Sequence, residues 1–361
     1  MVYVKANGIF NGERTMALVD RAGSETPLPL NPRRYQQGRF SAAGSRVALD
    51  VRDQDVDIWI ADVTRWVQSR PTFSAATDYF PVWTEDGRNV IFSSNRDGGV
   101  LNLFIQPADG SGEARRLTTS PNLEVPTAAT PDGKSVVFYE VMPTTGRDIM
   151  LLSLDTHMVR PLIQTRFEER FADVSRDGKW IAYESNSSGA FEIVKPFPNV
   201  ADGQWQVSNG GGTQPKWSQD GRELFFVGAD GALTVAGVAT TGTTFSTDAP
   251  HRILEPRYWS AGPDRTYDVS PDGKRFLMNK QSGADQGTAP PAGPDHQSNS
   301  AGTGTVPLMC PDETGKAFQP SCVQRGSFGA GAYSAHATWP RMDQYKPRAD
   351  GGCGRTSNSL W

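Results

Sequence analysis

The 361-residue sequence has little cysteine, little histidine and no long apolar run, and each shortage excludes a class of protein. No stretch approaches the about 18 consecutive apolar residues that a transmembrane helix needs. The N-terminal MVYVKANGIF also has no apolar run typical of a signal peptide. The charge is nearly balanced, with 36 Lys and Arg against 40 Asp and Glu, which is not typical of a nucleic-acid binder. We expect no membrane span, no signal peptide in this chain and no nucleic-acid partner.

The last part of the chain, residues 281–361, differs in composition from the rest. It holds all three cysteines, at spacings that contain no Cys-x-x-Cys pair typical of zinc sites. It is rich in Gly, Pro, Ser and Ala, and its only Ile, Val or Leu residues are Val306, Leu308, Val323 and Leu360. So little apolar surface cannot offset the conformational entropy of the chain. We expect a folded domain over 1–280 and a disordered, low-complexity tail over 281–361, which is either native or an out-of-frame extension.

The first 280 residues contain an internal repeat. Each copy has a short apolar strand, then Ser/Thr-x-Asp-Gly-Lys/Arg, then a second apolar strand. The copies are PVWTEDGRNVIFSS (81–94), PTAATPDGKSVVFYE (126–140), FADVSRDGKWIAYES (171–185), PKWSQDGRELFFV (215–227), TYDVSPDGKRFLM (266–278) and the degenerate GRFSAAGSRVALDV (38–51). Their motif glycines recur every 43 to 52 residues. This period is typical of a β-propeller with one four-stranded blade per repeat.

The Asp-Gly pair within each copy indicates a hairpin turn. The Asp side chain can accept hydrogen bonds from backbone N–H groups of its own turn, and Gly tolerates the positive φ that the turn needs. We therefore interpret the motif aspartates as structural and not catalytic. They are Asp86, Asp132, Asp177, Asp220 and Asp272.

The two ends of the repeat region are expected to complete one blade together. The last copy supplies two strands, and TMALVD (15–20) with a strand near 27–30 can supply the others. Such a pairing closes the ring and removes open sheet edges. The sequence therefore predicts an all-β fold, a six-bladed propeller with N- and C-terminal strands closing one blade. The further strand VYVK leaves seven blades open.

The blades resemble those of TolB-type, WD-like propellers with Pro-Asp-Gly repeats, as found C-terminal to bacterial serine/threonine kinases. The stretches that carry the resemblance include RVALDVRDQDVDIWIADV, YFPVWTEDGRNVIFSSNRDG and RTYDVSPDGKRFLM. It covers about residues 1–280 and implies an extracytoplasmic binding or assembly module, and it leaves open that the chain is a fragment of a larger protein. No kinase catalytic loop or Asp-Phe-Gly motif is present, so kinase activity is not implied.

Propeller function usually lies at one mouth of the central channel, which points to the loops that enter the innermost strands. The polar residues of these loops, our candidate ligand-binding set, are Asp78, Tyr79, Asn122, Glu124, Glu169, Arg170, Asn209, Asp264 and Arg265. Oxygen ligands from several blades could hold Ca²⁺, which prefers ~6–8 of them. The candidate metal ligands are Asp78, Asn122, Glu124, Glu169, Asn209 and Asp264. The alternative is that all are ordinary polar loop residues.

The search for catalytic motifs leaves the function open. There is no G-x-S-x-G elbow and no H-E-x-x-H. We expect His157 in a turn between outer strands and His251 in the outer part of its blade, away from the channel. We expect a monomeric ligand- or protein-binding module, with a protein partner or a small-molecule ligand at the channel mouth. The alternative is a calcium-dependent hydrolase of the lactonase or esterase type, in which the metal polarises a carbonyl and activates water. A third hypothesis is a peptidase accessory propeller without its catalytic domain.

Overall fold

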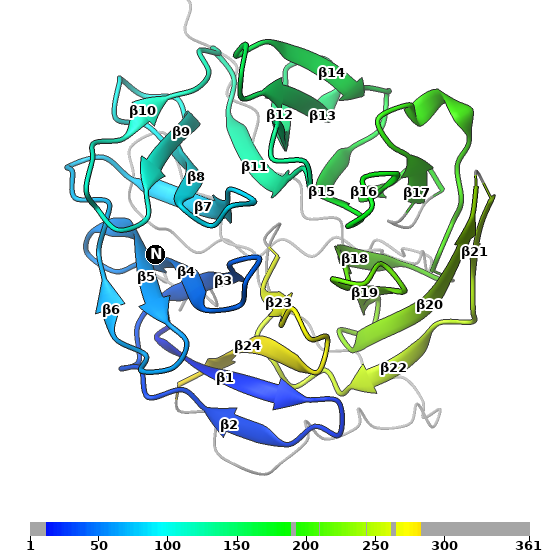
Figure 1. Ribbon diagram of the computed structural model, residues 1–361, viewed down its shortest axis with the longest axis horizontal. Helices are drawn as coiled ribbons and strands as arrows, with labels where there is room; N and C mark the ends of the chain where they lie inside the picture. Colours follow the sequence, from blue (N-terminus) through cyan, green and yellow to red (C-terminus); the bar gives the residue numbers. More distant parts are fainter. Residues whose placement is uncertain (1–11, 189–192, 209, 243, 261–264, 283–361) are drawn as a thin grey trace, which may run out of the picture. The chain divides into compact units, whose positions relative to one another are not determined.

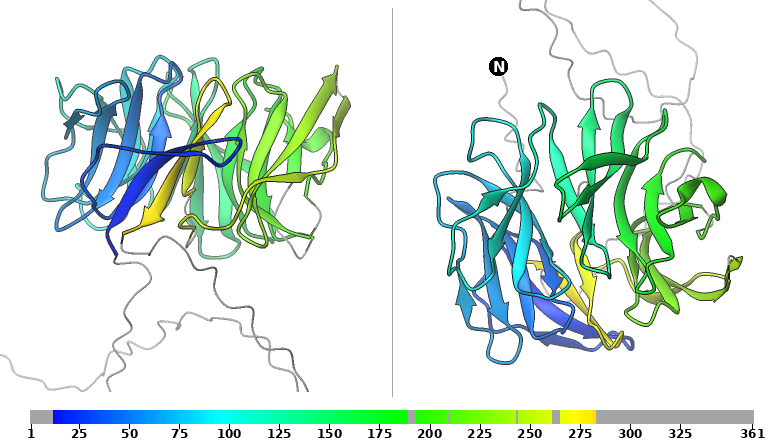
Figure 2. Two further views of the ribbon diagram at one scale, coloured as in Figure 1. Left: turned by 90° about the horizontal axis from the view of Figure 1, so that it is seen from below. Right: turned by 45° about the horizontal axis from the view of Figure 1, so that its top comes forward.

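The strands of the protein form a ring of antiparallel sheets around a central axis (Figure 1). The structure is a computed structural model that describes residues 12–188, 193–208, 210–242, 244–260 and 265–282. All of them belong to one compact unit, Met1–Ala289. The strands of these described ranges group into six sheets, which stand side by side when the ring is viewed from the side (Figure 2). The prediction of an all-β propeller is confirmed.

Each sheet takes its name from its innermost strand. From the axis outward, the first three sheets are β3 (Tyr35–Phe40), β4 (Arg46–Arg52), β5 (Val56–Asp62) and β6 (Gln68–Ser69); β7 (Asp78–Trp83), β8 (Asn89–Ser94), β9 (Asn102–Pro107) and β10 (Arg115–Arg116); and β11 (Glu124–Ala129), β12 (Ser135–Met142), β13 (Gly146–Ser153) and β14 (Val159–Ile163). The next two are β15 (Glu169–Val174), β16 (Trp180–Ser185) and β17 (Ile193–Pro196); and β18 (Gly212–Trp217), β19 (Glu223–Gly228) and β20 (Leu233–Thr241), with β21 (Thr244–Thr247) and β22 (His251–Leu254) both paired to β20. A single 3₁₀ turn in the described residues, η1 (Val200–Asp202), follows β17.

The remaining sheet joins the two ends of the propeller. It contains β23 (Tyr267–Val269), β24 (Arg275–Gln281), β1 (Arg14–Asp20) and β2 (Glu25–Pro27). β1 pairs with β24 without a break from Arg14↔Gln281 to Asp20↔Arg275. The predicted closure by N- and C-terminal strands is confirmed. The VYVK strand, on which the seven-blade alternative depends, lies outside the described residues.

The Asp-Gly motifs form the turns between the first and second strands of their sheets. In the β7 sheet, the Thr84 hydroxyl donates to Asp86 Oδ1 at 2.6 Å, and the same oxygen accepts from Arg88 N at 2.9 Å. Gly87 has a φ of 65°, a conformation that a side chain disfavours. The same hydroxyl-to-carboxylate bond recurs at Asp132, Asp177, Asp220 and Asp272. The structural interpretation of the motif aspartates is confirmed.

Five of the innermost strands carry β-bulges. The register shifts between Tyr79 and Val82 in β7, at the equivalent places in β15 and β18, between Pro126 and Ala128 in β11, and nearer the start of the strand, between Tyr35 and Gln37, in β3. Three non-glycine bulge residues have positive φ: Phe80 (58°), Phe171 (49°) and Gln214 (60°). Bulges change the direction of the side chains that follow them. The bulges therefore help to set the direction of the side chains at the ends of these strands.

Apolar side chains fill the space between neighbouring sheets. Phe92 and Phe104 pack against residues of the β3 sheet, and the rings lie 6.4 Å apart. Phe245 reaches from the β20–β21 hairpin onto Trp180 of β16, with 5.0 Å between the ring centroids. This packing fixes the sheets against one another and so positions the channel.

Among the described residues, no helix is long and apolar enough to cross a membrane. The tail expected over 281–361 lies outside the described residues, apart from Gln281 and Ser282. Its disorder stays a prediction.

Candidate binding site at the central channel

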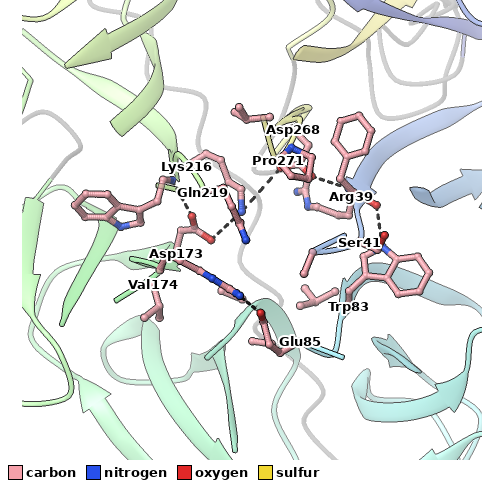
Figure 3. Close-up of a pocket in the computed structure, with 18 of the residues that line it drawn as sticks. Arg39, Ser41, Trp83, Glu85, Asp173, Val174, Lys216, Gln219, Asp268 and Pro271 are labelled. Atoms are coloured by element: carbon pink, nitrogen blue, oxygen red, sulfur yellow. Dashed lines mark hydrogen bonds and ion pairs between the residues drawn. The ribbon is translucent and has the colours of Figure 1, made fainter. Parts of the chain in front are cut away.

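Two layers of equivalent residues line one end of the central channel. The outer layer, the rim, consists of the residue after the Ser or Thr of each turn, one from each sheet. The rim residues are Ala42, Glu85, Pro131, Arg176, Gln219 and Pro271. The inner layer, the inner ring, consists of the residue two positions before that Ser or Thr. The inner-ring residues are Arg39, Val82, Ala128, Asp173, Lys216 and Asp268. Together the two layers enclose a cavity of about 130 Å³, the central pocket (Figure 3).

Charges alternate over four consecutive positions of the inner ring, Asp173, Lys216, Asp268 and Arg39. Both aspartates are held by the main chain of the following sheet. Asp173 Oδ2 accepts from Trp217 N at 2.8 Å, and Asp268 Oδ2 accepts from Phe40 N at 2.7 Å. The two carboxylates are therefore fixed in place and tie neighbouring sheets together.

Lys216 lies between the two aspartates. Its Nζ is 3.3 Å from Asp173 Oδ1 and 4.0 Å from Asp268 Oδ1, and a quarter of its side chain is exposed. An ammonium group has three donors. The long second distance shows that this cation is shared loosely and not bound closely to both acids.

Two guanidinium groups lie deeper in the channel. Arg39 donates to the carbonyls of Tyr267 at 3.1 Å and Arg265 at 3.0 Å, and to Gln37 Oε1 at 2.8 Å. Arg265 is 2 % exposed, and its Nη1 lies 3.7 Å from Asp173 Oδ1. Arg265 Nε and Asp268 Oδ1 are buried and have no hydrogen-bond partner among the described residues. The pocket therefore has donor and acceptor capacity that this part of the chain does not use.

The opposite side of the pocket is apolar. Val82 and Ala128 complete the inner ring, and both are largely buried. The Trp83 ring lies beside them, fixed by a bond from its Nε1 to the Arg39 carbonyl at 2.9 Å. Figure 3 shows Trp83 across the pocket from Asp173 and Lys216. The pocket thus presents a charged half and an apolar half.

The rim holds one ion pair. Arg176 Nη1 bonds Glu85 Oε1 between turns of the β15 and β7 sheets. The rim pair is neutral overall. Three cations, Arg39, Lys216 and Arg265, face two carboxylates below it, so the described residues that line the pocket carry one net positive charge.

Most of the residues predicted from the sequence lie at the other ends of the innermost strands. Asp78 and Glu169 begin β7 and β15, whereas the central pocket is lined by the ends of those strands. Both oxygens of Asp78 accept from Arg96 at 2.9 Å, and Glu169 accepts from the Thr165 hydroxyl. Asp78 and Glu169 are therefore hydrogen-bonded to nearby residues of the chain and do not line the central pocket.

Glu124, which begins β11, is buried and accepts from the Thr118 hydroxyl. Burial raises the pKa of Glu124 to about 7. Asn122 donates to Glu140 Oε1 at 2.9 Å. Glu124 and Glu140 are cross-strand partners, so two carboxyl groups lie close together on this sheet.

The other predicted residues divide between the two ends of the channel. Tyr79 packs on Phe80, with 5.7 Å between their ring centroids, and Arg170 Nε donates to Glu184 Oε2 at 2.7 Å. Arg265 alone of the described set lines the central pocket. Asn209 and Asp264 lie outside the described residues.

No group of three or more His, Cys, Asp or Glu side chains in the described part of the chain is arranged to hold a metal ion. Two of the six candidate ligands, Asn209 and Asp264, fall outside that part. The calcium site therefore stays a prediction, and so does the calcium-dependent hydrolase that depends on it.

Sequence reasoning missed the inner ring, although a signal for it exists. Aligning the copies on the turn Ser or Thr places Arg39, Asp173, Lys216 and Asp268 in one column two residues earlier. The other two copies have the apolar residues Val82 and Ala128 in this column. Charged residues at a strand position that can also be apolar indicate an unusual environment. The predicted residues come from the expected loops instead, because loops carry most binding residues in proteins.

Comparison with known proteins agrees with the geometry. Residues 34–192 match the family model of the TolB β-propeller domain. The chain is 24 % identical over 193 residues to a Bacillus subtilis (strain 168) protein named uncharacterized peptidase YuxL. That match covers 44 % of this chain and 29 % of the relative, so the chain spans less than a third of the relative's length.

Solved structures show the same fold at low sequence identity. A protein assigned as TolB from Agrobacterium tumefaciens has a TM-score of 0.58 and 17 % identity, over 75 % of this chain and 99 % of that one. TolB from Acinetobacter baumannii has a TM-score of 0.50 and 16 % identity, over 76 % and 65 %. Oligogalacturonate lyase from Vibrio parahaemolyticus has a TM-score of 0.50 and 12 % identity, over 77 % and 80 %. The described part of this chain therefore has the β-propeller fold of these structures, and residues 34–192 match the TolB β-propeller domain.

Proposed function

We propose that the propeller is a binding module that takes a small group of its ligand into the central pocket. The observation that carries this proposal is the pair of buried polar atoms without a protein partner, Arg265 Nε and Asp268 Oδ1. Leaving a buried polar group unsatisfied costs about 1–3 kcal/mol. A pocket kept for stability alone would pair these atoms or replace them by apolar groups. A ligand that satisfies them recovers that free energy.

The pocket is also held in one shape before a ligand arrives. Main-chain groups fix Asp173, Asp268 and Arg39, and the Trp83 indole is fixed by the Arg39 carbonyl. Side chains that are already ordered lose little entropy on binding, which favours affinity. This arrangement supports recognition of a small group by a rigid cavity.

The hydroxyl groups around the pocket support binding over nucleophilic chemistry. Thr84, Ser218 and Ser270 each donate their hydroxyl proton to the aspartate of their own turn, at 2.6–2.7 Å. Those aspartates belong to the turns, and a general base would have to face the reacting atoms instead. His157 and His251 are exposed at outer strands.

We propose that the ligand at the channel mouth is a protein partner or a small molecule. We also propose an extracytoplasmic location. The location rests on the resemblance to TolB-type propellers. The match to a protein named as a peptidase covers 29 % of that protein, and peptide hydrolysis is not part of the proposal.

A fragment screen by ligand-observed NMR on the full chain tests the site. We expect polar fragments to bind the wild-type protein and to lose binding in Ala128→Leu, which fills the inner ring. The matched control is Ala43→Leu, because Ala43 is exposed on the neighbouring turn and does not line the pocket. Fragments that bind Ala128→Leu as well as wild type, or none that bind wild type, would contradict the proposal.

A further inference from the structure

We propose that the group entering the central pocket is a carboxylate, bound by Lys216 and Arg265 with its aliphatic stem against Val82 and Ala128. The inference rests on the proposed function and names the ligand chemistry for the same pocket. It follows from the charge of the pocket, the unused hydrogen-bonding capacity and the division into two halves.

The charge of the pocket favours an anion. Below the neutral rim pair, Arg39, Lys216 and Arg265 face Asp173 and Asp268, which leaves one positive charge in excess within the described lining. Charges in a partly buried cavity are screened much less than charges at the surface. One added carboxylate makes the pocket neutral, whereas an added cation doubles the imbalance.

The unused capacity is mostly donor capacity. Arg265 Nε has no partner, and Lys216 Nζ is shared loosely at 3.3 and 4.0 Å with a quarter of its side chain exposed. The one unused acceptor, Asp268 Oδ1, already lies within the field of Lys216. A carboxylate can accept from both Arg265 Nε and Lys216 Nζ. Lys216 can then stay close to Asp173 and Asp268, which keep their main-chain hydrogen bonds. A ligand ammonium would have only Asp268 Oδ1 and would meet three cations.

The apolar half of the pocket sets the other requirement. Val82 and Ala128 offer no hydrogen bond, and the buried Trp83 ring stands beside them. Transfer of a ligand atom from water to this side of the pocket lowers the free energy only if the atom is apolar. A short aliphatic carboxylate meets both halves at once, whether it is a free acid or the side chain of a glutamate in a partner protein.

A series of three probes with four carbons each tests the inference on the full chain. Butyrate and butyramide share one shape and differ in head-group charge, and butylammonium supplies a cationic head group on a butyl chain. We expect butyrate to bind in the millimolar range, as befits six heavy atoms, and at least about tenfold more tightly than butyramide. Lys216→Met should remove this preference, and Lys274→Met, at an exposed turn residue, should keep it. The peptide acetyl-Ala-Glu-Ala-amide is then tested in place of butyrate. Its binding would show that the carboxylate can belong to a protein side chain, and binding of butyrate alone would indicate a free acid.

The outcomes separate this inference from the proposed function. Equal binding of the three probes, abolished by Ala128→Leu, would keep the binding site and overturn the carboxylate. Tighter binding of butylammonium would also overturn it, in favour of a cation at Asp268. Failure of all three probes and of the peptide would overturn both.

A tethered carboxylate tests the same chemistry without any ligand, and covers the case in which Lys216→Met fails to fold. Ala128→Glu places a carboxylate inside the pocket, and Ala128→Gln is its neutral match. At pH 7 we expect the Glu variant to melt at least about 2 °C above the Gln variant. The difference should vanish near pH 3, where the added carboxyl is protonated. A Glu variant that melts at or below the Gln variant at pH 7 would overturn the inference.

Discussion

Arg176 and Glu85 form an ion pair at the mouth of the central pocket, although 91 residues separate them in the sequence. They extend from the turns of the β15 and β7 sheets, and the β11 sheet lies between those sheets along the chain. Both side chains line the central pocket, so a ligand bound there would lie close to their charges.

The first prediction concerns the charge at the rim. Glu85→Gln removes a negative charge, so the affinity for butyrate should rise by up to about fivefold, and Arg176→Gln should lower it by a similar factor. These factors correspond to the ~0–1 kcal/mol typical of partly exposed ion pairs. Both variants should keep the wild-type melting temperature within about 2 °C. NMR titration measures the affinities, and changes of the same sign in both variants would contradict the charge argument.

The second prediction concerns the repeated turn. Gly87→Ala should destabilise the protein by about 1–3 kcal/mol, because the residue has a φ of 65°. Space does not limit the substitution, since an added Cβ would meet its nearest atoms at 3.8 Å. Gly87→Asn should lose less, because Asn adopts positive φ more readily than Ala. Urea unfolding measures both, and an Ala variant as stable as the Asn variant would show that the backbone conformation is not the cause.

The third prediction is a pH dependence from Glu124. Burial raises its pKa to about 7 in the folded state, well above the value of about 4.3 expected for an unfolded chain. The folded state therefore binds more protons between these values, and the free energy of unfolding should fall by about 1–3 kcal/mol as pH rises from about 4.5 to 8. Glu124→Gln should flatten this dependence, whereas the exposed Glu255→Gln should leave it unchanged. Denaturant unfolding across this pH range measures it, and parallel curves for wild type and Glu124→Gln would refute the assignment.

The fourth prediction decides the calcium hypothesis. The described candidate ligands Asp78, Glu124 and Glu169 each have a partner within the chain, so the binding-module account expects equal melting temperatures in calcium and in EDTA. A site filled at 100 times its dissociation constant would instead add about 2.7 kcal/mol of stability. Calorimetry of the full chain distinguishes the two. Stabilisation by calcium that Glu124→Gln removes would favour the hydrolase hypothesis.

The sequence predicted the fold through its repeat but not the binding pocket. The Asp-Gly turns and the pairing of β1 with β24 follow from local turn chemistry and from the repeat period, which are properties of neighbouring residues. The inner ring depends on bulges at residues such as Phe80 and Gln214, whose positive φ is unfavourable for their residue type. Such distortions are set by long-range contacts, including the bond from Gln214 N to Glu184 Oε1 at 2.6 Å. Local patterns therefore align the four charged residues in one column of the repeat, but they do not show the bulges that precede them.

Entry of a ligand into the central pocket can be tested by the indole N–H signals of Trp83 and Trp59 in a ¹H–¹⁵N spectrum of the full chain. Trp83 lies in the pocket wall, whereas Trp59 on β5 does not line the pocket. At least one of butyrate, butyramide and butylammonium should shift the Trp83 indole signal and leave the Trp59 signal in place. The Trp83 signal is assigned with the variant Trp83→Phe. A Trp83 signal that none of the probes moves, or equal shifts of both indoles, would contradict ligand entry into the pocket.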